Sequence, residues 1–169
     1  MCCVPSRCAA GRGTPVNDLP ARVVAALKAR GETLATAESL TGGGLAATVV
    51  DVSGASAVLR GGLIVYAVDL KATLAGVPED LLAERGPVDP DVAVYLARGA
   101  RDRCSATWGL STTGVAGPDA HGGFPPGTVY LGISGPTGDR YQRLDLDGGR
   151  AAIRAATVRE ALALLLSAL

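Results

Sequence analysis

Residues 36–45, TAESLTGGGL, place a serine hydroxyl between a carboxylate and three consecutive glycines. Glycines that open a helix after a strand leave backbone N–H groups free, and such groups can hold a phosphate or an oxyanion. Ser39 is therefore a candidate nucleophile, and Thr41, Gly42 and Gly43 are candidates for contacts with a bound anion. The alternative is that Ser39 is only the N-cap of the following helix, a role that serines commonly have.

A serine hydroxyl needs a neighbouring base, and the chain has a single histidine, His121, in a loop rich in glycine and proline. Tyr66 and Lys71 offer another possibility, because they follow an apolar segment that is typical of a strand. At the end of such a strand they would lie on the same sheet edge as Ser39. A lysine whose charge is disfavoured by burial can accept the serine proton, and a tyrosine can relay it. The alternative is a solvated lysine beside a half-buried tyrosine.

Two further segments could bind an anion. Residues 111–118, STTGVAGP, run from a predicted strand into a turn whose N–H groups could hold an oxyanion or a phosphate, although an ordinary tight turn has the same composition. Arg150 lies near the start of the last predicted helix, where its charge opposes the helix dipole and invites an anion; a plain surface position explains it equally well. The candidate contacts in the 111–118 turn are Thr113, Gly114, Ala116 and Gly117.

For the candidate side chains above to meet, the strands that precede them must end at the same edge of one sheet. The chain does alternate predicted helices and strands. Apolar spacing, caps and prolines predict helices over residues 17–30, 45–50, from 69, from 78, over 91–103 and over 149–166. Strands are predicted to end near residue 37 and to span 61–66, 108–113, 128–134 and 140–146. The last two strands flank a turn at 135–139, which indicates a hairpin and a mixed sheet. The predicted fold class is layered α/β.

Composition limits the function classes. The chain has 169 residues, 48% of them apolar and 19% charged, which favours one globular domain. Basic and acidic residues number 16 each and aromatics are few, so nucleic-acid binding is not expected. The start has no signal-like apolar segment, and the apolar run at 161–166 is too short to span a bilayer, so a cytoplasmic protein without membrane contact is expected.

Three of the four cysteines, Cys2, Cys3 and Cys8, lie in residues 1–16, a segment without periodicity that we expect to be a flexible leader. No histidine lies nearby, so no metal site is expected there. Cys104 stands alone at the end of a helical pattern and is expected in the core. The domain proper is expected over residues 17–169.

The ordered motifs closely resemble the CinA C-terminal domain family over about residues 17–168: TAES with TGG, Gly62 and Tyr66 with Lys71, Gly76-Val77, TGVAGP and PGTV. The resemblance implies a three-layer α/β/α domain, often dimeric, without a metal or cofactor. It implies hydrolysis of nicotinamide mononucleotide, a small nucleotide substrate, to nicotinate mononucleotide and ammonia. Ser39 would be the nucleophile, Lys71 the base and Tyr66 its partner in proton transfer. N–H groups near Gly42 or Gly114 would hold the oxyanion, and Arg150 would bind the phosphate.

The sequence also departs from the family at a few positions. Leu40 stands where relatives commonly have cysteine, Ala67 and Val68 replace two polar residues before the lysine, and Asp89 replaces a serine. These changes leave Ser39 and Lys71 in place but bear on substrate preference. Two alternatives therefore remain open: a nucleotide-binding module with weak turnover, and a serine amidase for a related carboxamide.

Overall fold

The computed structural model describes residues 18–169, and the predicted leader at residues 1–16 lies outside the described residues. Within these described residues, five strands form one mixed sheet in the order β2-β1-β3-β4-β5. They are β1 (Leu34–Glu38), β2 (Leu59–Ile64), β3 (Trp108–Gly114), β4 (Thr128–Gly135) and β5 (Gly138–Asp145). β1 pairs in parallel with β2 and β3, whereas β3, β4 and β5 pair antiparallel. The predicted mixed sheet and the closing hairpin are confirmed.

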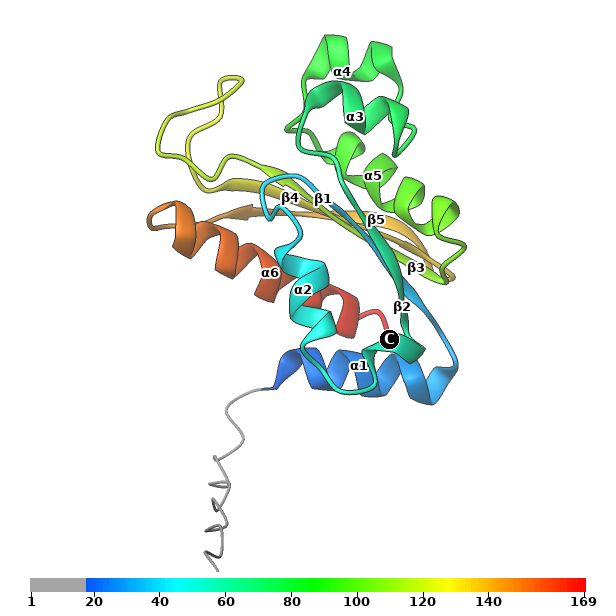
Figure 1. The fold of residues 1–169 in the computed structure, drawn as a ribbon. Helices are drawn as coiled ribbons and strands as arrows, with labels where there is room; N and C mark the ends of the chain where they lie inside the picture. The colour runs from blue at the N-terminus through cyan, green and yellow to red at the C-terminus, as the bar shows by residue number, and fades with distance from the viewer. Residues whose placement is uncertain (1–17) are drawn as a thin grey trace, which may run out of the picture.

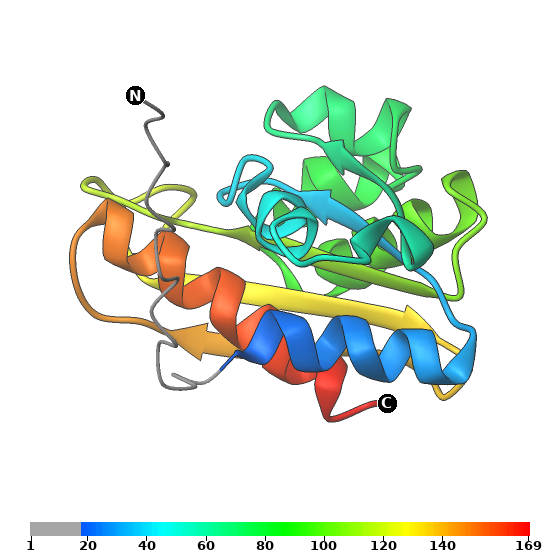
Figure 2. The ribbon, with the colours of Figure 1, turned by 60° about the horizontal axis from the view of Figure 1, so that its bottom comes forward.

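Helices cover both faces of this sheet (Figure 1). One layer contains α1 (Leu19–Arg30), α2 (Gly44–Val50) and α6 (Arg150–Leu166), and a short 3-10 turn, η1 (Ala55–Ala57), lies between α2 and β2. The opposite layer contains α3 (Val68–Thr73), α4 (Glu79–Arg85) and α5 (Pro90–Arg103). Figure 2 shows α1 and α6 side by side in front of the sheet. The molecule is therefore a three-layer α/β/α domain.

Local sequence explains the helix ends. The Asp18 carboxylate caps α1 by accepting the Ala21 N–H, and Gly31 ends this helix in a left-handed conformation. Asp89 caps α5 by accepting the N–H groups of Asp91 and Val92. Asp89, one of the departures from the family, is therefore a helix cap.

The core is split by the sheet. One apolar cluster joins α1, α2 and α6 to the sheet, and another joins α3, α4 and α5 to its other face. Because both faces are covered, every residue of β1 is buried. α5 lies so close to the sheet that a Cβ at Gly109 or Gly132 would overlap carbonyls of that helix. The site at the end of β1 thus rests on a fully buried interior strand of the sheet.

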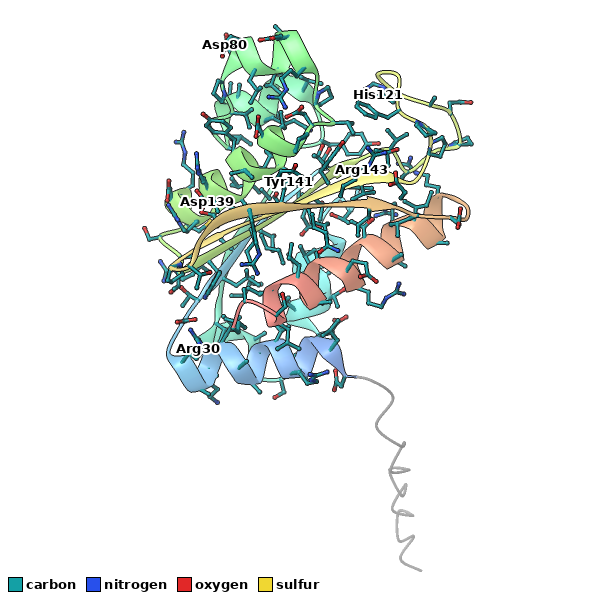
Figure 3. All side chains as sticks on the ribbon, turned by 180° about the vertical axis from the view of Figure 1, so that it is seen from behind. Arg30, Asp80, His121, Asp139, Tyr141 and Arg143 are labelled. Atoms are coloured by element: carbon teal, nitrogen blue, oxygen red, sulfur yellow. The ribbon has the colours of Figure 1, made fainter. Side chains whose placement is uncertain are left out.

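Two details differ from the predictions. The second strand starts and ends two residues earlier than expected, so Tyr66 lies in the connection to α3 rather than in a strand. Cys104, expected in the core, follows the last turn of α5 and is only partly buried. The prediction of β5 as a half-exposed edge strand is confirmed, and its Tyr141 and Arg143 lie on the outer surface (Figure 3). None of the helices in residues 18–169 has the length and apolar character needed to cross a membrane.

Candidate active site

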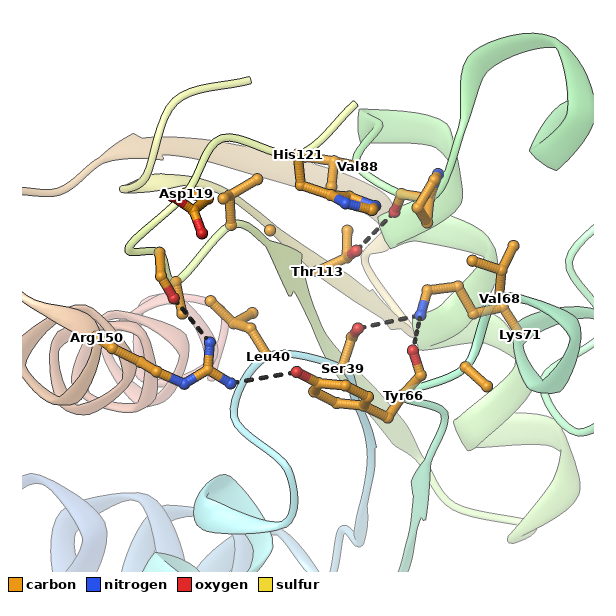
Figure 4. Close-up of a pocket in the computed structure, with 16 residues that line it drawn as sticks. Ser39, Leu40, Tyr66, Val68, Lys71, Val88, Thr113, Asp119, His121 and Arg150 are labelled. Carbon is orange, nitrogen blue, oxygen red and sulfur yellow. Dashed lines mark hydrogen bonds between the residues drawn. The ribbon is translucent and has the colours of Figure 1, made fainter. Parts of the chain in front are cut away.

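Ser39 begins a tight turn directly after β1 (Figure 4). Its N–H donates to the Thr112 carbonyl at 3.0 Å, which extends the pairing of β1 with β3 by one residue. Its carbonyl accepts the Gly42 N–H at 3.1 Å, which closes the turn. Gly42 and Gly43 have φ of +59° and +94°, a region that favours glycine. The glycines therefore let the chain reverse from β1 into α2 while Ser39 stays at the sheet edge.

The carboxylate of Glu38 occupies the N-terminal end of α2. It accepts hydrogen bonds at 2.8 to 3.2 Å from the N–H groups of Gly43, Leu45 and Ala46 and from the Thr36 hydroxyl. The N-cap residue of α2 is Gly43, so Ser39 is not the cap of this helix. The alternative structural role for Ser39 is thereby excluded.

The same contacts correct the predicted anion contacts at Thr41, Gly42 and Gly43. The N–H groups of both glycines already have acceptors, and Thr41 is fully buried with its hydroxyl 2.8 Å from that of Thr112. These three residues hold the turn in place and do not line the cavity at Ser39. The glycine pattern indicates free N–H groups, but it cannot show that the chain's own carboxylate takes them.

Lys71 reaches Ser39 from α3. Its Nζ lies 3.0 Å from the Ser39 Oγ, 2.6 Å from the Val65 carbonyl and 3.4 Å from the Tyr66 carbonyl. The side chain is 1% exposed, and no carboxylate in the described part of the chain forms an ion pair with it. Burial lowers the pKa of Lys71 to about 8, because desolvation disfavours the ammonium. A neutral amine at this position can accept the Ser39 proton.

The side chain of Tyr66 points away from Lys71. Its hydroxyl lies 3.2 Å from the Arg150 Nη2, and Tyr66 contacts Lys71 only through its backbone carbonyl. Arg150 also donates from Nη1 to the Gly117 carbonyl at 3.0 Å. Tyr66, which is 60% exposed, therefore forms a rim of the site together with Arg150.

A cavity of about 400 Å³ opens above Ser39 and Lys71. It brings together most of the predicted site residues: Ser39, Tyr66, Lys71, Thr113, Gly114, Ala116, Gly117 and Arg150. Several other lining residues were not among the predicted site residues, namely Leu40, Pro87, Val88, Val115 and Asp119. His121 lines the cavity from an exposed loop (Figure 4).

Two backbone N–H groups at this cavity are suited to an oxyanion. Leu40 follows Ser39, and no hydrogen bond within residues 18–169 uses its N–H. The Val115 N–H donates to Thr128 on β4, so the alternation of an antiparallel ladder turns the Gly114 N–H away from β4. A Cβ at Gly114 would come within 2.8 Å of the Val129 Cα, so only glycine fits there. Within the described residues, no three His, Cys, Asp or Glu side chains gather as metal ligands.

Comparisons with known proteins point to one family. The model of the CinA C-terminal domain matches residues 16–169. A CinA-like protein of Frankia casuarinae is 46% identical over 149 residues, 88% of this chain and 34% of the relative. A CinA-like protein of Anaeromyxobacter sp. strain Fw109-5 is 48% identical over 160 residues, 93% of this chain and 38% of the relative. The chain thus spans little more than a third of the length of these curated relatives.

Solved structures agree with this assignment. The crystal structure of the competence-damaged protein (CinA) superfamily protein KP700603 from Klebsiella pneumoniae has a TM-score of 0.86 at 31% identity, covering 89% of this chain and 94% of that one. The competence/damage inducible protein CihA from Agrobacterium tumefaciens has a TM-score of 0.84 at 32% identity, covering 92% and 98%. The whole α/β/α domain is therefore shared with these proteins.

Proposed function

The chain belongs to the CinA C-terminal domain family, and on this premise we propose that it hydrolyses the carboxamide of nicotinamide mononucleotide to nicotinate mononucleotide and ammonia. The observation that carries the proposal is the 3.0 Å contact between the Ser39 Oγ and the Lys71 Nζ beneath the cavity. The names of the relatives specify no substrate, so the reaction rests on the chemistry of this pair and on the family resemblance.

In the first half of the proposed reaction, the neutral amine of Lys71 takes the hydroxyl proton as the Ser39 Oγ attacks the carboxamide carbon. The oxyanion accepts hydrogen bonds from the N–H groups of Leu40 and Gly114. The Lys71 ammonium then gives its proton to the departing nitrogen, which leaves as ammonia. The product is an ester between Ser39 and the nicotinoyl group.

The second half releases the acid. Lys71, neutral again, takes a proton from a water that attacks the ester carbon, and then returns a proton to the Ser39 oxygen as the ester breaks. Nicotinate mononucleotide leaves with a carboxylate where the amide stood. One group, Lys71, thus serves as base and acid in both halves, and this role suits a pKa near neutrality.

The cavity offers a place for each part of this substrate. Its apolar wall, which includes Val68, Val88 and Val115, suits an aromatic ring, and its volume is within the range of small-molecule sites. Arg150 at the rim would hold the phosphate, because a guanidinium binds phosphate well. We also propose a cytoplasmic location, and the family resemblance supports a homodimer or higher homo-oligomer that acts without a metal or cofactor.

The test is ammonia release from nicotinamide mononucleotide by the purified protein with a chelator present. We expect Ser39→Ala and Lys71→Ala to lower the rate about 10³-fold or more, since each removes half of the nucleophile–base pair. Ser53→Ala and Lys28→Ala, at exposed positions outside the cavity, are the matched controls. Undiminished release by Ser39→Ala would reject the serine mechanism.

A related carboxamide is the second candidate substrate, because Ala67 and Val68, two of the departures from the family, line the cavity. A panel of nicotinamide, its riboside, its mononucleotide and the dinucleotide separates the two. Faster release from another member of the panel would favour the second candidate. Tight binding of the mononucleotide without any release would favour the binding module.

A further inference from the structure

Arg154, on α6, contacts the back of the turn that carries Ser39. Its Nε donates to the Leu40 carbonyl at 2.9 Å and its Nη2 donates to the Thr41 carbonyl at 2.8 Å. Two separate nitrogens of one planar group thus bond consecutive carbonyls, and this fixed fork is a geometry that a guanidinium provides, whereas an ammonium has a single nitrogen. No ion pair within the described residues uses Arg154, so its charge is directed at these two carbonyls.

The fork controls the direction of the Leu40 N–H through two rigid peptide planes. The Thr41 carbonyl and the Gly42 N–H belong to one planar peptide, and that N–H donates to the Ser39 carbonyl. The Ser39 carbonyl and the Leu40 N–H belong to another planar peptide, in which they point in opposite directions. Holding the Thr41 carbonyl therefore holds the Leu40 N–H at the cavity.

We propose that Arg154 is a positioning residue that sets the oxyanion site by fixing the turn after Ser39. It approaches from the helical layer opposite α3, which carries Lys71, so it acts on the oxyanion side of the site without contact to the base (Figure 1). The inference rests on the proposed function, because the oxyanion belongs to amide hydrolysis. It adds a residue that lies outside the Ser39 cavity and that the family resemblance does not assign.

Steady-state kinetics of Arg154→Met and Arg154→Lys test this role with nicotinamide mononucleotide. For Arg154→Met we expect kcat to fall about 10²-fold, the usual cost of losing one oxyanion donor, with KM within about 3-fold of the wild type. Arg154→Lys keeps the charge but loses the planar fork and has a shorter reach, so it should give an intermediate kcat. Arg159→Met is the matched control, since this exposed arginine of the same helix pairs with Glu160 and has no other ion pair within residues 18–169. Its kcat should equal that of the wild type.

The pH profile separates positioning from a general collapse of the site. Lys71 keeps its burial if only the turn loosens, so the activity midpoint should stay near pH 8 in Arg154→Met. A midpoint that moves toward the ordinary lysine pKa of 10.5 would show that water has reached Lys71, and it would overturn the positioning role. An unchanged kcat in Arg154→Met would overturn it too.

A fluorophosphonate probe separates failure of this inference from failure of the proposed function. The serine oxygen attacks phosphorus, its proton passes to Lys71, fluoride leaves, and the phosphoryl oxygen occupies the oxyanion site, whichever carboxamide is the true substrate. Slower labelling of Ser39 in Arg154→Met than in Arg159→Met supports the inference even if nicotinamide mononucleotide is not hydrolysed. Equal labelling of the two variants overturns the inference alone. No labelling of the wild type overturns the serine mechanism of the proposed function and the inference with it.

Discussion

Glu38 and Lys71 are two charged side chains on either side of Ser39, each 1% exposed, with opposite surroundings. The Glu38 carboxylate accepts four hydrogen bonds, three of them from the start of α2. The Lys71 amine contacts two carbonyls and the Ser39 hydroxyl, and no carboxylate of residues 18–169 forms an ion pair with it. The carboxylate of Glu38 is satisfied by hydrogen-bond donors and so anchors the backbone of the turn. The ammonium of Lys71 is buried without a counter-charge, so loss of its proton is favoured.

The two surroundings follow from the elements that supply the groups. Glu38 is the last residue of β1 and meets a helix N-terminus, whose N–H groups and dipole favour an anion. Lys71 is on α3, and its ammonium enters a pocket floor made of carbonyls and a hydroxyl. The first arrangement stabilises the turn, and the second lowers the pKa of the base.

The sharpest test of this contrast is Lys71→Met, which should lower the activity while raising the stability of the fold. We expect kcat to fall about 10³- to 10⁴-fold, because the base is lost. We expect the free energy of unfolding at neutral pH to rise by about 1 to 3 kcal/mol, because an uncompensated buried charge is replaced by an apolar chain of similar length. Ammonia release and urea denaturation measure the two effects, with Lys28→Met as the control.

The difference in the free energy of unfolding between Lys71→Met and the wild type should depend on pH, because the pKa of Lys71 is lowered in the folded protein. Between about pH 8 and pH 10.5 the unfolded chain holds a proton on Lys71 that the folded protein has released, so wild-type stability rises with pH in this window. The gain is on the order of 3 kcal/mol and is complete above the unfolded pKa. The advantage of Lys71→Met should therefore shrink as pH rises. A gap that is constant with pH would show that Lys71 is not desolvated.

Glu38→Gln tests the other side of the contrast. The amide keeps one acceptor oxygen but turns an NH₂ toward backbone N–H groups, so we expect a loss of about 2 to 3 kcal/mol in the free energy of unfolding. Urea denaturation measures it, with Glu84→Gln, at an exposed position of α4, as the control. Activity should fall as well, because the turn after Ser39 loosens. A stability change as small as that of the control would mean that the carboxylate is no anchor.

The sequence predicted the helices, the strands and the Ser39–Lys71 pair of this site better than it predicted the side chains that hold the turn after Ser39. Helical spacing, caps and prolines are local, and each bound that they predicted for an α-helix or a strand lies within a few residues of the observed one, whereas the 3-10 turn η1 was not predicted. Ser39 and Lys71 could be paired because strand ends meet at one sheet edge, and the family resemblance singled out the same residues. The roles of Glu38 and Arg154 depend on where their side chains point; Arg154 bonds a carbonyl 114 residues away. No periodicity or motif in one sequence reports such a contact.

Tyr66→Phe should have the smallest effect. The resemblance predicts a role for Tyr66 in proton transfer, yet its hydroxyl lies at Arg150 and its contact with Lys71 is through a carbonyl that the substitution keeps. We therefore expect KM for nicotinamide mononucleotide to rise roughly 3- to 10-fold with kcat within about 2-fold of the wild type, because Arg150 loses a partner at the rim. Tyr141→Phe, on β5 and exposed, is the control.

The split between KM and kcat in Tyr66→Phe decides between two assignments. If the phenol relays the proton, kcat should fall about 10²-fold or more, since general acid–base groups contribute that much. Tyr66 and Lys71 would then act together as the base, and the lowered pKa of Lys71 alone would not account for the activation of Ser39. If only KM changes, the burial that lowers the pKa of Lys71 is sufficient to activate Ser39, and Tyr66 belongs with Arg150 to substrate binding.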